Sequence, residues 1–245
     1  MKINLNHSSM DTARALILHL IELMNAEPER TFNIAFSGGD TPALMYDMWA
    51  NDYRTVTPWE RMRVYFVDER CVPVENSESN YGVLRLLLLG PSPISYDNVF
   101  AIRGICPPEE EARRYSRLVR DHLPDKGGWP VFDILLLGAG EDGHTSSIFP
   151  GNEKLLFSDK VYEATFSPYN GQPRIALTGR PLMAARKVIF LITGQRKAVV
   201  VQEICESGDI SPAAYIARRA KDVELFIDSN AASLLTRVAD PATER

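Results

Sequence analysis

Short apolar runs alternate along this chain with longer segments in which apolar residues recur at three- and four-residue steps. The short runs predict strands, the clearest at 31–36, 63–67, 134–137, 187–193 and 223–227, with weaker candidates at 1–6, 99–102, 160–166 and 174–178. The longer segments predict helices at 8–27, 43–50, 80–89, 109–122 and 195–206, and a short one at 181–185. This alternation is typical of an α/β fold with a mostly parallel sheet.

The alternation predicts a three-layer α/β/α sandwich around a mostly parallel, Rossmann-like central sheet. No internal repeat, low-complexity tract or linker interrupts the pattern, so we expect a single α/β domain over residues 1–245. Polar segments directly follow predicted strands at 37–42, 68–70, 138–144 and 194–197. Because the carboxyl ends of parallel strands share one edge of a sheet, we expect these segments to form one pocket.

Composition and charge narrow the classes of partner. The chain is 45% hydrophobic and 24% charged, and its net charge of −5 gives no basic footprint for nucleic acid. The apolar runs are too short to span a membrane, and the N-terminus lacks the pattern of a signal peptide. Cys71, Cys106 and Cys205 are odd in number and widely spaced, which fits reduced thiols. We therefore expect a cytoplasmic protein that binds neither nucleic acid nor membrane.

The segment Asp133–Gly151, DILLLGAGEDGHTSSIFPG, is the richest in candidate chemistry, because an apolar strand runs into glycines that frame Glu141, Asp142 and His144. Its glycines also match the G-x-G-x-x-G turn of dinucleotide-binding folds. That turn must open a helix, whereas a Pro-Gly pair soon follows and leaves room for at most a short one. Asp159 has the spacing of a ribose-binding acid but precedes the next predicted strand. We therefore do not expect a dinucleotide here.

Two further segments have the character of an anion site. Ser37–Pro42 reads SGGDTP between a predicted strand and a predicted helix, for which Thr41 suits the N-cap and Pro42 the first helical position. Free amides and the helix dipole at such a turn favour a phosphate, although any tight strand–helix turn uses glycines. Arg196 and Lys197 begin a later helix, where the dipole disfavours cations unless an anion is bound. The alternative is that no anion binds and both side chains are solvated.

Charges also follow the strand at 63–67, either at a ligand-binding edge or in a solvated loop. The polar segments occur in a recognisable order: SGGDTP (37–42), DERCVP with a following SN (68–73 and 79–80), GAGEDGHTSSIFPG (138–151) and G-x-x-K-A (194–198). In this order, and across most of the chain, they resemble the family of 6-phosphogluconolactonases and glucosamine-6-phosphate isomerases/deaminases. Each segment alone is a weak signal, and the ordered set is specific.

Within that family the resemblance favours the lactonase branch. The deaminases have an essential acid five residues after the histidine of the DGH segment, where this chain has Phe149. They also have tyrosine where this chain has Arg70. Two milder departures are Asp40, where lactonases often have serine or arginine, and Ser147, which replaces a common alanine.

The resemblance implies hydrolysis of 6-phospho-D-glucono-1,5-lactone, a phosphosugar lactone of the oxidative pentose phosphate pathway, by a monomer or homodimer. It implies that His144 is the general base that activates water and that Asp142 orients its ring. Arg70 and Lys197 would neutralise the phosphate. The implied substrate site as a whole is Gly38, Gly39, Asp40, Thr41, Asp68, Arg70, Arg174 and Lys197. No cofactor or metal is expected, since the DGH segment lacks the ligand spacing of a zinc site.

Three other functions remain open at this point. A glucosamine-6-phosphate deaminase would release ammonia from its substrate, and Phe149 argues against it. A non-catalytic sensor of sugar phosphates would keep the phosphate-binding groups and would not need His144. A dehydrogenase would bind a nicotinamide nucleotide.

Overall fold

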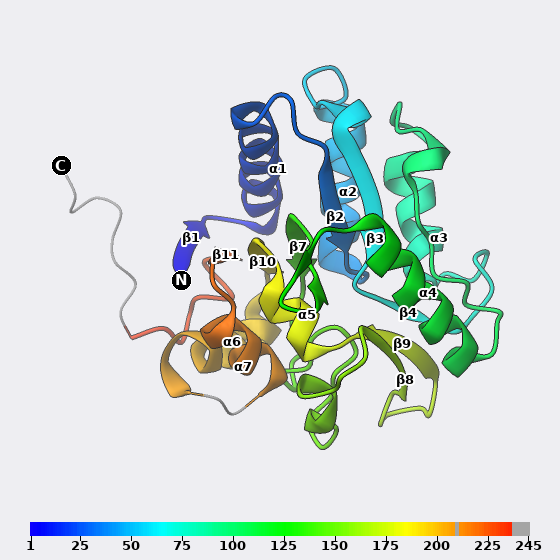
Figure 1. Cartoon of the computed structure of the whole chain (residues 1–245). Helices are drawn as coiled ribbons and strands as arrows, with labels where there is room; N and C mark the ends of the chain where they lie inside the picture. The colour runs from blue at the N-terminus through cyan, green and yellow to red at the C-terminus, as the bar shows by residue number, and fades with distance from the viewer. Residues whose placement is uncertain (209–210, 237–245) are drawn as a thin grey trace.

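A computed structural model describes residues 1–208 and 211–236, and it contains a central sheet of six strands (Figure 1). The strands lie in the order β1-β11-β10-β7-β2-β3, and each neighbouring pair is parallel. Their bounds are β1 Lys2–Asn6, β2 Phe32–Phe36, β3 Met62–Phe66, β7 Ile134–Leu137, β10 Lys187–Ile192 and β11 Val223–Asp228. The predicted parallel sheet is confirmed.

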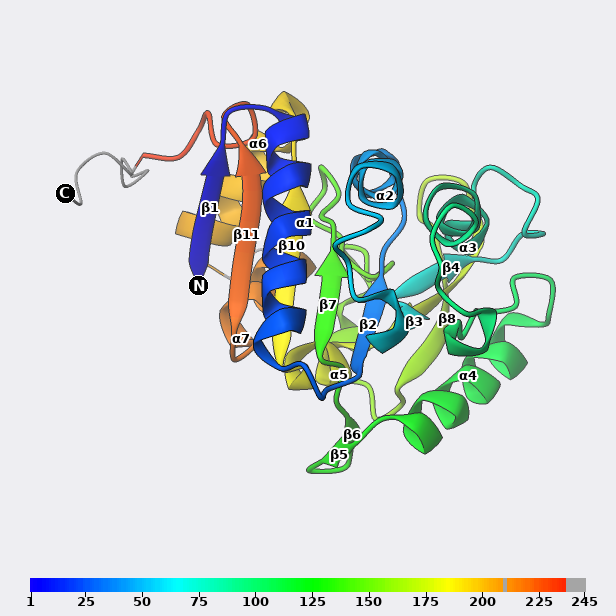
Figure 2. The ribbon, with the colours of Figure 1, turned by 90° about the horizontal axis from the view of Figure 1, so that it is seen from above.

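Helices cover both faces of this sheet and complete the predicted three layers (Figure 2). On one face, α1 (Ser9–Ala26) packs against α2 (Asp40–Asp52). On the other lie α5 (Gly179–Ala184), α6 (Ala198–Gln202) and α7 (Pro212–Arg219). The helix α1 begins where the Ser8 hydroxyl accepts a hydrogen bond from the Asp11 amide.

A second, antiparallel sheet was not predicted. It consists of β4 (Asp68–Arg70), β9 (Pro173–Leu177) and β8 (Tyr162–Phe166), and α4 (Pro108–His122) packs against it. The strands β8 and β9 were predicted as segments, but no helix separates them. A connection that short joins antiparallel strands, because parallel neighbours need a long crossover. The charged residues after β3 are therefore in a strand rather than a solvated loop.

The remaining differences from the sequence pattern are local. The candidate strand at 99–102 forms a single bridge, between Val64 and Val99. The helix at 80–89 divides into α3 (Asn80–Leu84) and a π-helical turn, and the helix at 195–206 divides into a 3₁₀ turn (Gln195–Lys197), α6 and a second π-helical turn. A small hairpin of β5 (Asp125–Lys126) and β6 (Trp129–Pro130) precedes β7.

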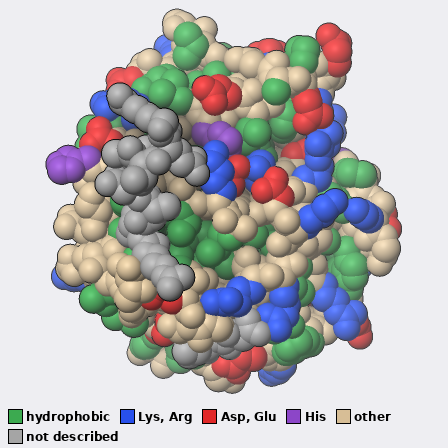
Figure 3. Space-filling model, turned by 90° about the vertical axis from the view of Figure 1, so that its left-hand side faces the viewer, with side chains coloured by type: hydrophobic (Ala, Val, Ile, Leu, Met, Phe, Trp, Pro, Cys, Tyr) green, Lys and Arg blue, Asp and Glu red, His purple; other side chains and the backbone are tan. Residues whose placement is uncertain are grey.

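One cluster of buried apolar side chains extends through the described residues, from Ala13 to Ala232. The strands β2 and β7 are buried along their whole length, as expected for parallel strands covered on both faces. Acidic and basic side chains are interspersed on the surface beside β1 (Figure 3). Among the described residues, no helix combines the length and apolar character needed to cross a bilayer.

Candidate active site

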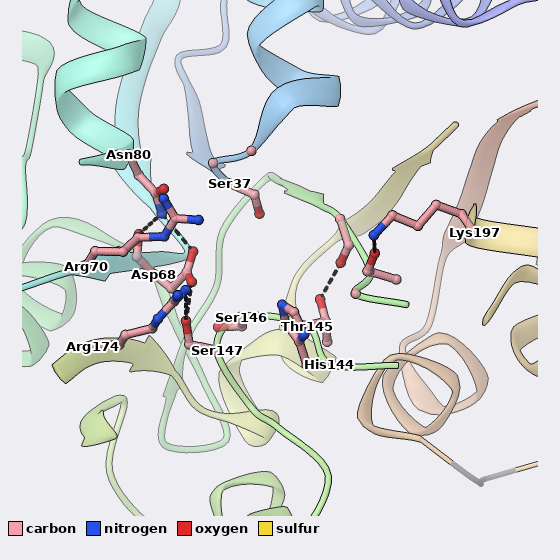
Figure 4. A pocket seen from close by; sticks show the side chains of 15 residues that line it. Ser37, Asp68, Arg70, Asn80, His144, Thr145, Ser146, Ser147, Arg174 and Lys197 are labelled. Carbon is pink, nitrogen blue, oxygen red and sulfur yellow. Dashed lines mark hydrogen bonds between the residues drawn. The ribbon is translucent and has the colours of Figure 1, made fainter. Parts of the chain in front are cut away.

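The four polar segments meet at the carboxyl edge of the sheet, where the parallel strands end, around a cavity of about 180 Å³ (Figure 4). Its walls come from residues 37–39 after β2, Asp68 and Arg70 of β4, residues 138–140 and 144–147 after β7, Arg174 of β9, and Lys197 after β10. Asn80 of α3 completes them. The predicted pocket is confirmed as geometry. Of the predicted site residues, Asp40, Thr41 and Asp142 do not line it.

The glycine turn after β2 leaves backbone amides open at the start of α2. Gly39 adopts φ +113°, which strains any residue with a side chain, and it caps α2 without a side-chain hydrogen bond. A Cβ atom on Gly38 would lie 1.7 Å from Oδ1 of Asn80, so glycine is required there. The predicted N-cap at Thr41 is wrong, because Gly39 already turns the chain and α2 begins at Asp40. Asp40 is exposed, outside the cavity.

Two arginines face each other across the pairing of β4 with β9, where Arg70 lies directly opposite Arg174. Like charges in this position destabilise a sheet unless something compensates them. Neither guanidinium has a carboxylate within 4.0 Å among the described residues. Burial and the neighbouring Arg70 both lower the pKa of Arg174, which Asp68 partly offsets.

The nearby carboxylate of Asp68 is bound by neutral donors instead. Its Oδ1 accepts a hydrogen bond from Nδ2 of Asn80 at 3.1 Å, and its Oδ2 accepts one from the Ser147 hydroxyl at 2.5 Å. The arginines contact neutral atoms too: Nη1 of Arg70 donates to the Glu78 carbonyl at 2.5 Å, and Nη1 of Arg174 is 3.5 Å from Oγ of Ser147. The pocket therefore keeps positive charge available for an anion.

Lys197 adds a third cation from the opposite wall. Its Nζ donates to the Ala139 carbonyl at 2.8 Å, which holds the amine at the cavity. The pKa of Lys197 is lowered overall, because the effect of burial outweighs that of the nearby acids Glu141, Asp142 and Asp40, which raise it. A half-buried ammonium ion beside a backbone carbonyl is well placed to bind a phosphate.

His144 lies in the turn after β7 and lines the cavity. Its Nδ1 is 2.7 Å from Oδ1 of Asp142, a contact in which the ring nitrogen donates to the carboxylate. Burial raises the pKa of Asp142, but hydrogen bonds from His144 and Tyr169 outweigh it and hold that pKa well below its ordinary value. The ionised carboxylate thus fixes the tautomer in which Nε2 of His144 is free to accept a proton. A side chain at Gly140 would collide with this pair, 2.1 Å from Nδ1.

Phe149 lies against the histidine, with ring centroids 4.5 Å apart, and is 2% exposed. The loop between them places Ser146 and Ser147 at φ +51° and +54°, a left-handed conformation that is uncommon for residues other than glycine. The sequence pattern assigned no role to Asn80 and gave Ser147 only as a mild departure from the family. Both line the cavity. Their contacts depend on tertiary packing, for which the SN and TSS patterns gave no direct signal.

The glycine turn after β7 does not open the helix that dinucleotide binding requires. After Gly143 the chain makes turns, and its next helical segment is a 3₁₀ turn at Glu153–Leu156. No group of three or more His, Cys, Asp or Glu side chains in residues 1–208 and 211–236 is arranged to hold a metal ion.

A family described as Glucosamine-6-phosphate isomerases/6-phosphogluconolactonase matches residues 7–225. The 6-phosphogluconolactonase of Haemophilus influenzae is 30% identical over 237 residues, which cover 94% of this chain and 100% of that protein. The human 6-phosphogluconolactonase is 39% identical over 179 residues, 72% of this chain and 69% of that one. The solved 6-phosphogluconolactonase of Trypanosoma brucei has a TM-score of 0.86 at 29% identity, covering 96% of this chain and 98% of its own. The chain belongs to the family of glucosamine-6-phosphate isomerases and 6-phosphogluconolactonases.

Proposed function

We propose that this protein hydrolyses 6-phospho-D-glucono-1,5-lactone to 6-phospho-D-gluconate in the oxidative pentose phosphate pathway. The relatives named above are 6-phosphogluconolactonases. The single observation that supports the proposal most is that one cavity contains both His144, with its ring oriented by Asp142, and three basic side chains that have no carboxylate partner among the described residues.

The basic side chains would bind the substrate's phosphate. Arg70, Arg174 and Lys197 supply charge, and the open amides of the turn at 38–41 supply neutral donors at a helix N-terminus. A phosphate at Arg70 and Arg174 would also relieve their mutual repulsion across the two strands. Asp68 stays bound to neutral partners and does not compete for the guanidinium groups.

His144 would act on the lactone carbonyl. Its Nε2 takes a proton from water while the water oxygen attacks the carbonyl carbon, which forms a tetrahedral intermediate. The intermediate collapses by breaking the bond between this carbon and the ring oxygen, and the protonated His144 returns its proton to that oxygen. The products are a hydroxyl and a carboxylic acid, which ionises. Asp142 stabilises the imidazolium form between the two transfers.

Phe149 distinguishes this reaction from deamination. In the resemblance the deaminases have an acid at this position, and here an aromatic ring packs against His144 instead. Asp142 is the carboxylate that contacts the histidine. The active-site loop thus has the residues of the lactonase branch.

The test is lactone hydrolysis by the wild type beside His144→Ala, corrected for spontaneous ring opening. Loss of a general base lowers kcat by about 10²–10⁴. We expect KM to change little, because the phosphate contacts remain. Near-wild-type turnover in His144→Ala would remove the histidine from the mechanism. Binding of 6-phosphogluconate by a wild type without hydrolysis would indicate a sensor.

A further inference from the structure

The hairpin of β8 and β9 brings a residue to the active site that the sequence did not single out. Tyr169 lies between these strands, and its hydroxyl donates a hydrogen bond to Oδ2 of Asp142. The other oxygen, Oδ1, accepts from Nδ1 of His144 at 2.7 Å and from the His144 amide at 3.2 Å. The carboxylate is thus held from both sides, by the candidate base and by the tyrosine.

Phe149 makes aromatic contacts with both His144 and Tyr169. The Phe149 ring centroid is 4.5 Å from that of His144 and 6.1 Å from that of Tyr169, the latter in an edge-on contact at 81°. Tyr169 is 70% exposed, yet Phe149 supports its ring and Asp142 holds its hydroxyl. Two different contacts therefore define where this exposed side chain lies.

The hairpin itself is anchored on the phosphate side of the cavity. Within it, the Ser167 amide donates to the Gln172 carbonyl at 3.0 Å. Nε2 of Gln172 donates to Oε2 of Glu78 at 2.9 Å, and the Glu78 carbonyl accepts the hydrogen bond from Arg70. The segment that carries Tyr169 is thereby connected to a phosphate-binding arginine as well as to His144.

The hydrogen bond gives Tyr169 a defined protonation state. Its contact with Asp142 raises the pKa of the Tyr169 phenol above its ordinary value, so the hydroxyl remains a donor. The same bond contributes to the lowered pKa of Asp142, next to the contribution of His144. Lys197 is a further charged group that interacts with Asp142. The carboxylate thus stays ionised while it faces the imidazole.

We propose that Tyr169 is a positioning residue for His144, acting through Asp142. This inference rests on the proposed function, in which His144 is the base. The phenol fixes one carboxylate oxygen, so that the other faces Nδ1 and Nε2 is directed at the substrate. No proton passes to Tyr169, and it does not touch the reacting atoms.

The test compares Tyr169→Phe with a matched control, Tyr96→Phe. Tyr96 is also exposed, at 55%, and its hydroxyl has no hydrogen bond within residues 1–208 and 211–236. We expect Tyr169→Phe to lower kcat about 3- to 10-fold, with KM changed less than about twofold. The acid limb of the kcat/KM profile should move to higher pH, because without the phenol the whole carboxylate charge favours the protonated imidazole.

The control should match wild type in every measurement. A Tyr169→Phe enzyme with the kcat and pH profile of Tyr96→Phe would overturn the inference, and if His144→Ala is inactive in the same assay the proposed function would still hold. A lower unfolding midpoint with an unshifted acid limb would assign Tyr169 a structural role and also overturn it. Full activity in His144→Ala would overturn the inference and remove His144 from the mechanism, whereas a wild type that does not hydrolyse the lactone would overturn the proposed function as well.

Discussion

The two edges of the central sheet contain similar charged residues and arrange them in opposite ways. At the amino edge, where the strands begin, Asp133 contacts Arg30, accepts from the Asn33 amide at 2.8 Å and lies 3.4 Å from Arg186. Glu224, at the same edge, pairs with Lys187 at 2.6 Å and His19 at 3.2 Å. These acids and bases satisfy one another.

At the carboxyl edge, the basic side chains around the cavity have no such partners among the described residues. In the described part of the chain no carboxylate lies within 4.0 Å of Arg70, Arg174 or Lys197, and Asp68 is bound by Asn80 and Ser147. A buried charge is costly unless it is paired, so an anion that bound here would stabilise this edge. Mutually paired charges indicate a structural role, and unpaired basic side chains around a cavity indicate a ligand site. Five predictions test this contrast.

The largest effect should follow removal of the acid at the amino edge. Asp133→Ala leaves the buried Asn33 side-chain amide and backbone N–H without their shared acceptor and leaves Arg30 with only Glu27, so it should lower the free energy of unfolding by about 3 kcal/mol. Urea denaturation measures this, and kcat/KM of the folded enzyme should be unchanged. The control is Asp159→Ala, because the exposed Asp159–Arg180 pair should contribute less than about 1 kcal/mol. Equal stabilities of the two variants would contradict the prediction.

Acids at the two edges should also respond to pH in opposite ways. Burial raises the pKa of Glu224, but Lys187 and His19 outweigh it, so the stabilisation by this acid is lost as the pH falls through its lowered value. Burial raises the pKa of Glu69, on the carboxyl edge, from 4.5 to about 7, although hydrogen bonds from the backbone amides of Tyr81, Asn80 and Arg70 lower it. Its contribution is complete below pH 4.5 and is lost as the pH rises to about 7.

The Glu69 effect is measured by urea unfolding of the wild type and Glu69→Gln at pH 5 and pH 8. The wild type should lose up to about 3 kcal/mol more between these pH values than the variant, which cannot ionise. The same pH dependence in both proteins would exclude Glu69 as its source.

Two lysines offer a matched pair across the edges. Lys197→Met should raise KM about tenfold, because it removes a charged donor that we propose binds the phosphate, and should leave the unfolding midpoint nearly unchanged. Lys187→Met should lower the midpoint, because it leaves Glu224 and Asp222 without that cation, and should not change KM. Steady-state kinetics and thermal unfolding separate them. If both variants had the same effects, the contrast between the edges would be lost.

The smallest effect concerns Ser147. Ser147→Ala removes the hydroxyl bound to Oδ2 of Asp68, which then becomes available to Arg174. Competition for this guanidinium should raise KM about 2- to 5-fold with little change in kcat. A KM equal to that of the wild type would show that Asp68 does not compete for Arg174 when the Ser147 hydroxyl is lost.

The sequence predicted that the segments following the parallel strands lie close together, because the carboxyl ends of parallel strands share one edge of a sheet. That rule placed His144, Arg70 and Lys197 in one pocket without any knowledge of contacts. It could not predict that Arg70 lies opposite Arg174, since this register belongs to an antiparallel sheet that forms only in the tertiary structure. Tyr169 escaped notice because its partner Asp142 is distant along the chain.

The most direct test of the contrast is the preference for a phosphorylated lactone. This preference is the ratio of kcat/KM for 6-phosphogluconolactone to kcat/KM for the lactone without phosphate. Arg70→Ala should lower the ratio about 10- to 100-fold, because it removes the charge-assisted hydrogen bonds that we propose it donates to the phosphate. Arg186→Ala, at the amino edge, should leave the ratio at the wild-type value. An unchanged ratio in Arg70→Ala, or an equal fall in both variants, would contradict a phosphate site at the carboxyl edge.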